Sequence, residues 1–450
     1  MQESDEKRKE SCKMKPQKIK RDPQVDLFKI ELNRIVNTQH PLVKLAHQID
    51  WDAFDQEFET HFADEGRPAI ATRLMVALHY LKYSNDFSDE ETVALWVENP
   101  YWQYFSGRQH FEHELPIEPS SMTRWRKRIG VEGAERLLSQ TITTAVKERY
   151  LKRSQCQRVN VDTTVQTKDV RFPTDARLYD RMRERLVKTA QTEGIVLRQS
   201  YTYVGKEALR RQQNYAHAQQ GRRAAKQTRR LKTMLGRVTR DIERKAQNPS
   251  NFLKEQLALS HRLLKQERDS KNKIYSIHEP HVQCIAKGKA HQRYEFGCKV
   301  GYVTSAKGNW ILGAQAFNDN PYDGHTLQKS LEQAKRLTHV VIEQAACDQG
   351  YRGHGVSDAN ILIVPRRKKG ASKAIRHWWR RRNAIEPIIG HQKSDHRLNR
   401  NQLAGELGDQ LNVIFSACGF NIKKLIRAFW LWIQNAMDCF IAVNFQRTFA

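Results

Sequence analysis

The sequence predicts a mixed α/β protein with an all-helical N-terminal domain and a long, basic helical insertion. Amphipathic helical spacing fills residues 26–153. From residue 154 onward, short alternating segments typical of strands are followed by strands and helices in alternation, the pattern of a mixed α/β core. Residues 205–272 interrupt this core with Lys, Arg, Gln and Ala and with sparse Leu, Met and Ile at helical spacing.

The composition indicates a polyanionic partner. The 450 residues suffice for two or three domains with their own cores. They carry 77 Lys and Arg against 50 Asp and Glu, a net charge of +27. Such an excess favours binding to nucleic acid, with a strong dependence on salt. It indicates nothing about chemistry.

Cysteine usage and hydropathy indicate the compartment. The 7 cysteines include no CxxC pair, which favours reduced thiols in a cytosol over a disulfide framework or a zinc site. Lys423, Lys424 and Arg427 interrupt the apolar tract 411–445, so a membrane span is not expected. The charged N-terminus lacks the apolar stretch of a secretory signal. We therefore expect a cytoplasmic, nucleoid-associated protein.

Residues 26–153 are predicted to form a helical DNA-binding domain after a disordered basic tail, residues 1–25. The segment SNDFSDEE, residues 84–91, predicts a turn and a helix cap. In PIEPSSMTRWRKRIG, residues 116–130, Ser120 or Ser121 is the expected N-cap. The basic residues that follow favour the recognition helix of a helix-turn-helix, with a merely basic surface helix as the alternative. These candidate DNA contacts are Arg124, Arg126, Lys127 and Arg128.

The insertion, residues 205–272, is predicted to be a charged helical hairpin split at residues 248–250. A solvated arm, a surface against DNA and a surface against a second subunit all fit its composition. The first part of the core is expected at 154–204, and its second part, with closing helices, at 273–450.

Three acids in the core are the candidate catalytic residues. Asp162 lies in the predicted strand 157–167, Asp348 ends the predicted strand in 339–353, and Glu386 lies in a helix after a further strand and a basic loop. Ligands gather at strand ends in α/β sheets, so neighbouring strands would let the three carboxylates converge. Divalent ions would neutralise such a cluster, and two of them about 3.5–4 Å apart can activate a water or a 3′-hydroxyl. Any one of these acids alone is more often structural.

The segment WWRRRNAIEPIIGHQK, residues 378–393, is predicted to present one helix face. Trp379, Arg382, Glu386 and Lys393 fall at helical spacing on that face. Glu386 is then available as a ligand to a hard cation such as Mg²⁺. The alternative is a solvated basic helix in which Glu386 pairs with Arg382 or Lys393. Pro387 must begin a helical turn or kink the helix.

Five motifs occur along the chain: VDTT around Asp162, FPTD at 172–175, PYDGHTL at 321–327, ACDQGYRG around Asp348, and RRRNAIEPIIGHQKSDHRLNRNQLAG at 380–405. As a set they resemble the DDE transposases of the insertion sequence five family, which have an RNase H-like catalytic core. The last motif is similar to the family's tyrosine–arginine–glutamate–lysine signature, with Trp379 at the tyrosine position as a departure. Residues 40–130 are similar to the family's helical N-terminal domain.

The resemblance implies a function and a set of roles. Asp162, Asp348 and Glu386 would bind two Mg²⁺ ions, for which Mn²⁺ can substitute, and would carry strand cleavage and transfer. Arg382 and Lys393, with Trp379 beside them, would contact DNA near the cut. The partners would be double-stranded DNA at the element ends and the target, within a homodimer or a larger synaptic complex. A DNA-binding relative without catalysis and an RNase H-like endonuclease are the alternatives.

Other polar residues carry weaker expectations. Asp323 and His325 are expected as an Asx-turn and helix cap, with a place near the metals as the alternative, and Asp175 is expected as a cap. Tyr351 and Arg352, which follow Asp348, are candidates for contact with the scissile strand. His391 and His396 are expected to be surface residues or DNA contacts.

Overall fold

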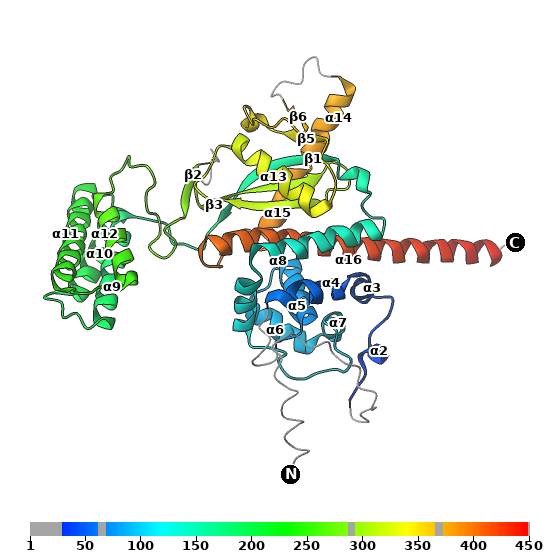
Figure 1. Cartoon of the computed structure of the whole chain (residues 1–450), viewed down its shortest axis with the longest axis horizontal. Coiled ribbons are helices and arrows are strands. Elements are labelled where there is room, and N and C mark those ends of the chain that lie inside the picture. Colours follow the sequence, from blue (N-terminus) through cyan, green and yellow to red (C-terminus); the bar gives the residue numbers. More distant parts are fainter. Residues whose placement is uncertain (1–28, 62–68, 287–292, 365–371, 449–450) are drawn as a thin grey trace, which may run out of the picture. The chain divides into compact units, whose positions relative to one another are not determined.

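The structure is a computed structural model that describes residues 29–61, 69–286, 293–364 and 372–448 (Figure 1). The predicted tail, residues 1–25, and most of the basic loop that follows residue 363 lie outside these residues. The chain forms two compact units. The first, here called the core unit, comprises Met1–Gln166, Lys299–Phe317 and Pro321–Ala450; the second, the helical unit, comprises Thr167–Cys298 and Asn318–Asn320.

The N-terminal part of the core unit is all helical, as predicted. Its helices are α2 (Leu32–Ile35), α3 (Pro41–Gln48), α4 (Trp51–Phe58), α5 (Thr72–Asn85), α6 (Asp89–Glu98), α7 (Pro100–Phe105) and α8 (Pro119–Lys147), with a 3-10 turn at Glu59–His61. The predicted cap is confirmed, because Ser88 and Glu91 form a capping box at the start of α6. The predicted N-cap of α8 is wrong: Glu118 holds that position, and Pro119 begins the helix. Gly130, with φ 61°, has non-helical backbone angles and divides α8 directly after the basic segment 116–130.

One mixed sheet forms the centre of the fold, which confirms the predicted mixed α/β class. Its strands are β1 (Arg158–Thr167), β2 (Gln283–Ala286), β3 (Tyr294–Ser305), β4 (Ile311–Phe317), β5 (Gln344–Cys347) and β6 (Asn360–Ile363). Their order is β2-β3-β1-β5-β6, with β4 also paired to β3. Strands β1, β5 and β6 pair in parallel, whereas β2 and β4 run antiparallel to β3.

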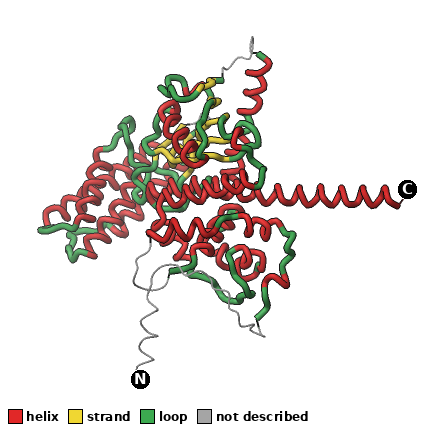
Figure 2. Tube along the Cα trace, turned by 45° about the vertical axis from the view of Figure 1, so that its right-hand side comes forward, coloured by secondary structure: helices red, strands yellow, loops and turns green. Residues whose placement is uncertain are grey.

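Helices of the core unit pack on this sheet. They are α13 (Asp323–Thr338), α14 (Lys373–Arg382), α15 (Ile385–Asp395) and α16 (Gly405–Thr448). Figures 1 and 2 show α8 and α16 side by side beneath the sheet, and both contact β4. A single helix, α16, replaces the several closing helices that the sequence predicts. No helix in the described ranges is long and apolar enough to cross a membrane.

The helical unit has its own hydrophobic core, which the sequence prediction missed. It contains α9 (Asp175–Thr192), α10 (Thr202–His217), α11 (Gly221–Lys245) and α12 (Asn251–Lys265). Residues of all four helices share one cluster, among them Met182, Ala208, Leu235 and Leu253. The unit therefore includes α9, which the sequence analysis assigned to the catalytic core, and it starts at Thr167 instead of residue 205. Its insertion part is three helices and not a hairpin.

Substitution of Gly419 by Ala should lower the free energy of unfolding by roughly 1–3 kcal/mol, because α16 packs closely on α5. A Cβ atom at Gly419 would overlap the backbone carbonyl of Tyr83. Gly390→Ala is the matched control, since nothing lies within 4 Å of a Cβ at that helical position. The control should gain stability by about 1 kcal/mol or less. Denaturant unfolding measures both, and equal effects would contradict the close α5–α16 contact.

Candidate active site

The register of the sheet places two of the predicted acids next to each other. Strand β1 pairs in parallel with β5, with Arg158 opposite Gln344 and Asn160 opposite Ala346. Continued by two residues, this register puts Asp348, directly after β5, level with Asp162 in β1. The strands are thus neighbours, which is the condition for the acids to converge.

All three predicted acids approach one side chain, Arg382. Its Nη2 lies 3.1 Å from Oδ2 of Asp162 and 3.9 Å from Oδ2 of Asp348. Its Nη1 lies 3.9 Å from Oε1 of Glu386. The exposed fraction of the side chain rises from 15% for Asp162 to 42% for Asp348 and 67% for Glu386. Glu386 therefore has the most freedom to move. We call these three acids and Arg382 the acid cluster.

The position of Arg382 is set by the end of α14. The side-chain amide of Asn160 in β1 donates to the carbonyl of Arg381 at 3.2 Å, which ties α14 to the sheet. The predicted continuous helix is wrong, because α14 ends at Arg382 and α15 begins at Ile385. Pro387 lies in the first turn of α15, where its missing N–H leaves no helical bond unmade. Glu386, four residues after Arg382, still lies near it across this break.

A fourth carboxylate, Asp323, adjoins the cluster. Its Oδ1 accepts a hydrogen bond from the Thr163 hydroxyl at 2.9 Å and lies 2.9 Å from the Lys299 ammonium. The expectation that Asp323 caps a helix is wrong, because Tyr322 is the N-cap of α13 and Asp323 begins the helix without a cap bond. Sequence reasoning missed Lys299. A lysine in the middle of the largely apolar strand YEFGCKVGYVTS was the available signal, since a buried charge needs a partner.

Residue 350 is a glycine because its backbone lies very close to two carboxylates. The Gly350 N–H donates to Oδ1 of Asp348 at 2.9 Å, which fixes that side chain. A Cβ at Gly350 would lie 2.9 Å from Oδ2 of Asp323 and 3.0 Å from Oδ1 of Asp348. Any larger residue would push one of these carboxylates away. In the same way the Thr163 N–H fixes Oδ1 of Asp162 at 2.8 Å.

Buried polar atoms around the cluster lack partners. They include Nε of Arg382, the hydroxyl of Tyr351 and Oδ1 of Asn160. Burial raises the pKa of Tyr351 well above its usual value, and the negative charges of Asp162 and its neighbours raise it further. Tyr351 is fully buried, so the expected contact with a DNA strand is wrong for this side chain. Unsatisfied buried groups each cost about 1–3 kcal/mol, so each of them needs an explanation, such as a bound water, a bound ion or a catalytic role.

The donor chemistry of the site fits a hard divalent cation. Asp162, Asp348, Glu386 and Asp323 offer only carboxylate oxygens, which Mg²⁺ prefers. In the arrangement shown, the Arg382 guanidinium stands among three of them. Among the described residues, no three His, Cys, Asp or Glu side chains are grouped so as to hold a metal ion. The acids are thus brought around a guanidinium, and a bound cation would need Arg382 to withdraw.

Comparison with known proteins places the chain in a family. Residues 30–128 match the model described as Transposase domain (DUF772). The chain is also 51% identical over 195 residues to the uncharacterized protein ORF8 in the nfe locus of Rhizobium meliloti. That alignment covers 43% of this chain and 94% of the Rhizobium protein. The chain belongs to a transposase family. No solved structure matches it.

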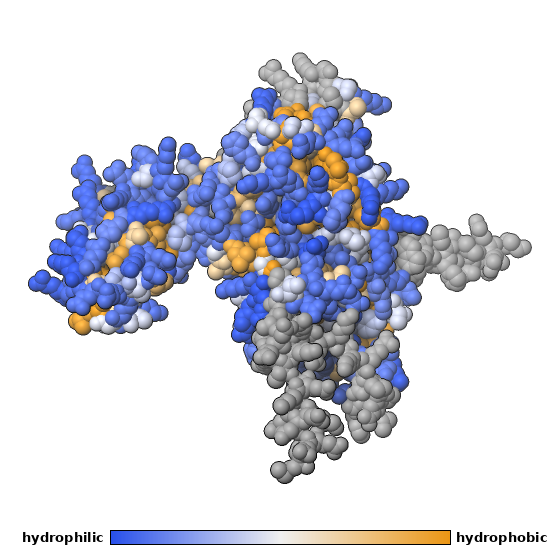
Figure 3. All heavy atoms as spheres, in the orientation of Figure 1, coloured by the Kyte–Doolittle hydropathy of each residue, from blue (hydrophilic) through white to orange (hydrophobic). Residues whose placement is uncertain are grey.

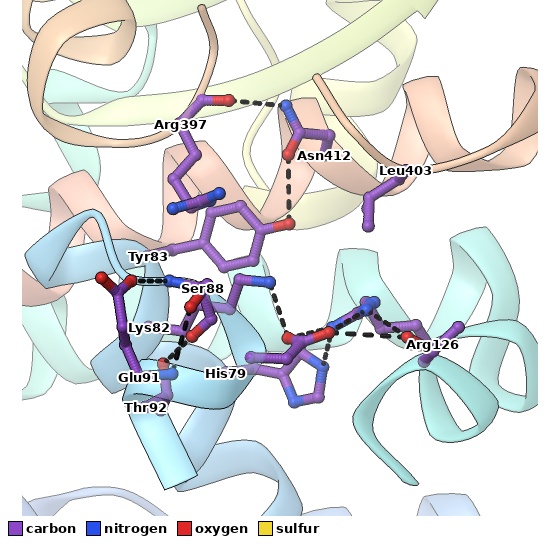
Figure 4. A network of polar contacts seen from close by, with 12 residues as sticks. His79, Lys82, Tyr83, Ser88, Glu91, Thr92, Arg126, Arg397, Leu403 and Asn412 are labelled. Atoms are coloured by element: carbon purple, nitrogen blue, oxygen red, sulfur yellow. Dashed lines mark hydrogen bonds and ion pairs between the residues drawn. The ribbon is translucent and has the colours of Figure 1, made fainter. Parts of the chain in front are cut away.

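The transposase domain buries one of the predicted DNA contacts. Arg126 is only 2% exposed, and its guanidinium donates to both carboxylate oxygens of Asp89, at 2.8 and 2.6 Å. The Lys82 ammonium lies 2.6 Å from the same carboxylate. Figure 4 shows Lys82 and Arg126 directed towards each other across this contact. The prediction that Arg126 contacts DNA is therefore wrong, whereas Arg124, Lys127 and Arg128 are exposed.

Other predicted contacts of this transposase-family chain also divide by burial. Trp379 is 2% exposed and Arg382 faces the acids, so neither presents a surface to DNA in this arrangement. His396 is buried with Nδ1 2.8 Å from the Tyr83 carbonyl, and burial lowers its pKa to about 4, which corrects its expected role at the surface. Lys393 is half-buried; Arg352 and His391 are exposed, and His391 pairs with Asp395 at 2.8 Å.

Proposed function

We propose that the chain is a DDE transposase with an RNase H-like core, which cleaves DNA at the ends of its element and joins the 3′ ends to target DNA. One observation carries the proposal. Three acids from distant parts of the chain, Asp162, Asp348 and Glu386, all lie within 3.9 Å of one guanidinium. They do so in a chain of net charge +27 that belongs to a transposase family.

The residues of the site have distinct roles in this proposal. Mg²⁺ or Mn²⁺ held by the three acids would supply Lewis-acid activation of the attacking oxygen and stabilisation of the leaving oxygen. Asp162 and Asp348 are oriented in advance by the Thr163 and Gly350 N–H groups. Glu386 is exposed and free to turn inwards. Arg382 neutralises the acids in the absence of cations and can pair with a DNA phosphate once they are bound.

The proposed partner is double-stranded DNA from the element ends and the target. Exposed cations on the transposase domain and beside the acids, Arg124, Lys127, Arg128 and Arg352, are placed to contact the phosphate backbone. Lys393 and Trp379 lie on the same segment as Glu386 and would be reached after a change in side-chain position. Two DNA molecules must meet, so we propose that a homodimer or larger synaptic complex acts.

The direct test uses the full chain and linear DNA with the sequences that flank its coding region. With Mg²⁺ a gel should show strand cleavage and joined products, and chelation of Mg²⁺ should remove both. Nicked DNA without joined product would instead identify an endonuclease. DNA binding without any metal-dependent scission would identify a binder without catalysis. Either result would overturn the proposal.

Replacement of Arg382 by Ala should strengthen cation binding, because the guanidinium competes with cations for the acids. Each tenfold gain in affinity adds about 1.4 kcal/mol to the stabilisation by Mg²⁺ at saturation. The measurement is the rise in Tm with Mg²⁺ or Mn²⁺, in the absence of DNA. Arg381→Ala is the matched control, since Arg381 is exposed and its side chain forms no ion pair within the described ranges. Equal rises for Arg382→Ala and the wild type would show that Arg382 does not compete.

A further inference from the structure

Helix α11 of the helical unit has two sharply different faces. One face, with Leu231, Leu235 and Val238, is buried in the core that α11 shares with α9, α10 and α12. The opposite face carries exposed basic residues at intervals of three or four along almost the whole helix. We call these residues the α11 ridge: Arg222, Lys226, Arg229, Arg237, Arg240 and Arg244, with Thr233 in the one gap.

Among the described residues, a carboxylate pairs with the α11 ridge only at Arg244. The helix has no Asp or Glu between Gly221 and Arg240. Within the described ranges, none of the ridge residues before Arg244 forms an ion pair with a carboxylate; Arg244 lies 3.5 Å from Asp241. Neighbouring α10 differs, because Glu207 pairs with both Arg210 and Arg211, at 2.9 and 2.6 Å. Like charges three or four residues apart destabilise a helix. The ridge therefore does not stabilise α11, and its positive charges are available to an external anion.

The length and shape of the ridge select the anion. Arg222 and Arg244 are separated by 22 residues, or about 33 Å at 1.5 Å per residue. One turn of B-form DNA is about 34 Å long. The apolar face of α11 is already buried, and no large hydrophobic side chain of this helix is exposed, so it lacks what an interfacial membrane helix inserts. Two copies would not pair ridge to ridge, because the two rows of positive charge would repel each other.

We propose that the α11 ridge binds the phosphate backbone of duplex DNA along about one helical turn. Hydrophilic residues cover most of the visible surface of the helical unit in Figure 3, which fits a unit that rests on a polyanion. The choice of DNA as the ligand rests on the proposed function, whereas the anion-binding character of the ridge does not. The inference is independent of the acid cluster, because all residues of the ridge belong to the helical unit.

The test compares two triple variants of the full chain. Arg229→Gln, Arg237→Gln and Arg240→Gln remove three charges from the ridge. Lys206→Gln, Arg210→Gln and Arg211→Gln remove three exposed charges from α10 and form the matched control. Binding of a labelled 30-base-pair duplex is measured by anisotropy at several salt concentrations. The ridge variant should bind at least about tenfold more weakly, and the slope of log K against log salt should fall by roughly 3 × 0.9. The control should change both much less.

Several outcomes would overturn the inference. Equal losses in the two variants would show that only total charge matters. A loss for double-stranded RNA but not for DNA, or a ridge-dependent sedimentation with phosphatidylserine vesicles, would assign another ligand. Unchanged Tm values in both variants confirm that folding is intact. Separate assays distinguish this inference from the catalytic proposal. The Asp162→Asn chain, which should not cleave DNA, should bind the duplex with the same salt dependence as the wild type. If the ridge variant binds DNA as tightly as the wild type, the ridge inference is wrong but the catalytic role of the acid cluster is not affected.

Discussion

The Asp162→Asn chain should cleave DNA at least about three orders of magnitude more slowly than the wild type. Asn keeps the shape of the side chain and can still accept the 2.8 Å hydrogen bond from the Thr163 N–H, but it removes the negative charge. Asp162 is the least exposed of the three acids and lies closest to Arg382, at 3.1 Å. Loss of several kcal/mol of charge stabilisation in the transition state corresponds to this factor, at 1.36 kcal/mol for each tenfold change.

Rates of strand cleavage under single-turnover conditions measure the effect. Asp358→Asn is the matched control, because Asp358 is exposed and, within the described part of the chain, its carboxylate contacts only the hydroxyl of neighbouring Ser357. Parallel substitution of Asp348 and Glu386 by their amides should give losses of similar size. If the Asp162→Asn chain keeps more than about a tenth of the wild-type rate, the acid cluster is not the catalytic site.

Substitution of Asp89 by Ala should destabilise the chain by about 3–5 kcal/mol, the largest effect on stability that we expect. Asp89 is the shared anion for two buried cations, Arg126 and Lys82, whose side chains are 3% and 5% exposed. Its removal leaves both positive charges in a low-dielectric interior without compensation. Burial already lowers the pKa of Lys82 to about 8 with the carboxylate present. Denaturant unfolding measures the loss.

The same network predicts a pH dependence. Burial alone would raise the pKa of Asp89, but hydrogen bonds from Arg126 and the charges of Lys82 and Arg126 lower it well below its usual value. A carboxyl with a lowered pKa in the folded state contributes stability above its unfolded pKa, near 3.9, and loses that contribution as the pH falls. The free energy of unfolding of the wild type should therefore decrease as the pH is lowered from about 4. The Asp89→Ala chain should lack the contribution of this carboxyl to that decrease.

The control for this network is Glu90→Ala, one residue further along α6, where the side chain is exposed. It should change the free energy of unfolding by less than about 0.5 kcal/mol. A loss below about 1 kcal/mol for Asp89→Ala would show that water or other side chains compensate Arg126 and Lys82. In that case Arg126 would be available for DNA, as the sequence alone suggested.

The elements with regular local patterns were predictable. Strand β1 follows the alternation around Asp162, and the capping box at Ser88 follows directly from its local sequence. The two aspartates could be singled out because an acid in a strand of apolar neighbours needs a partner. Local patterns do not indicate the partner of these two aspartates: both face Arg382, a contact that depends on the register of β1 and β5 and on the position of α14. The approach of Glu386 to Arg382, in contrast, is the alternative that helical spacing predicts.

Burial of long charged side chains was the main source of error. Arg126 and Arg382 each belong to a run of exposed arginines, and nothing in a run distinguishes the member that turns inwards. Only its partner from another element, Asp89 or Asp162, does so. The predicted boundary of the helical unit is wrong for a related reason. Helix α9 reads like any amphipathic helix, and only its packing on α11 shows which core it completes.

The place where the helical unit enters the chain has a consequence for engineering. Strands β1 and β3 are adjacent, and the hydrogen bonds of Ala306 to Arg158 and of Lys168 to Phe296 show that they run in opposite directions. In connectivity the segment between β1 and β3, which includes α9 to α12 and β2, takes the place of a hairpin turn. A short Asn-Gly connection between these strands could replace it without rerouting the backbone. Such a miniaturised chain would keep every carboxylate of the acid cluster while discarding the α11 ridge.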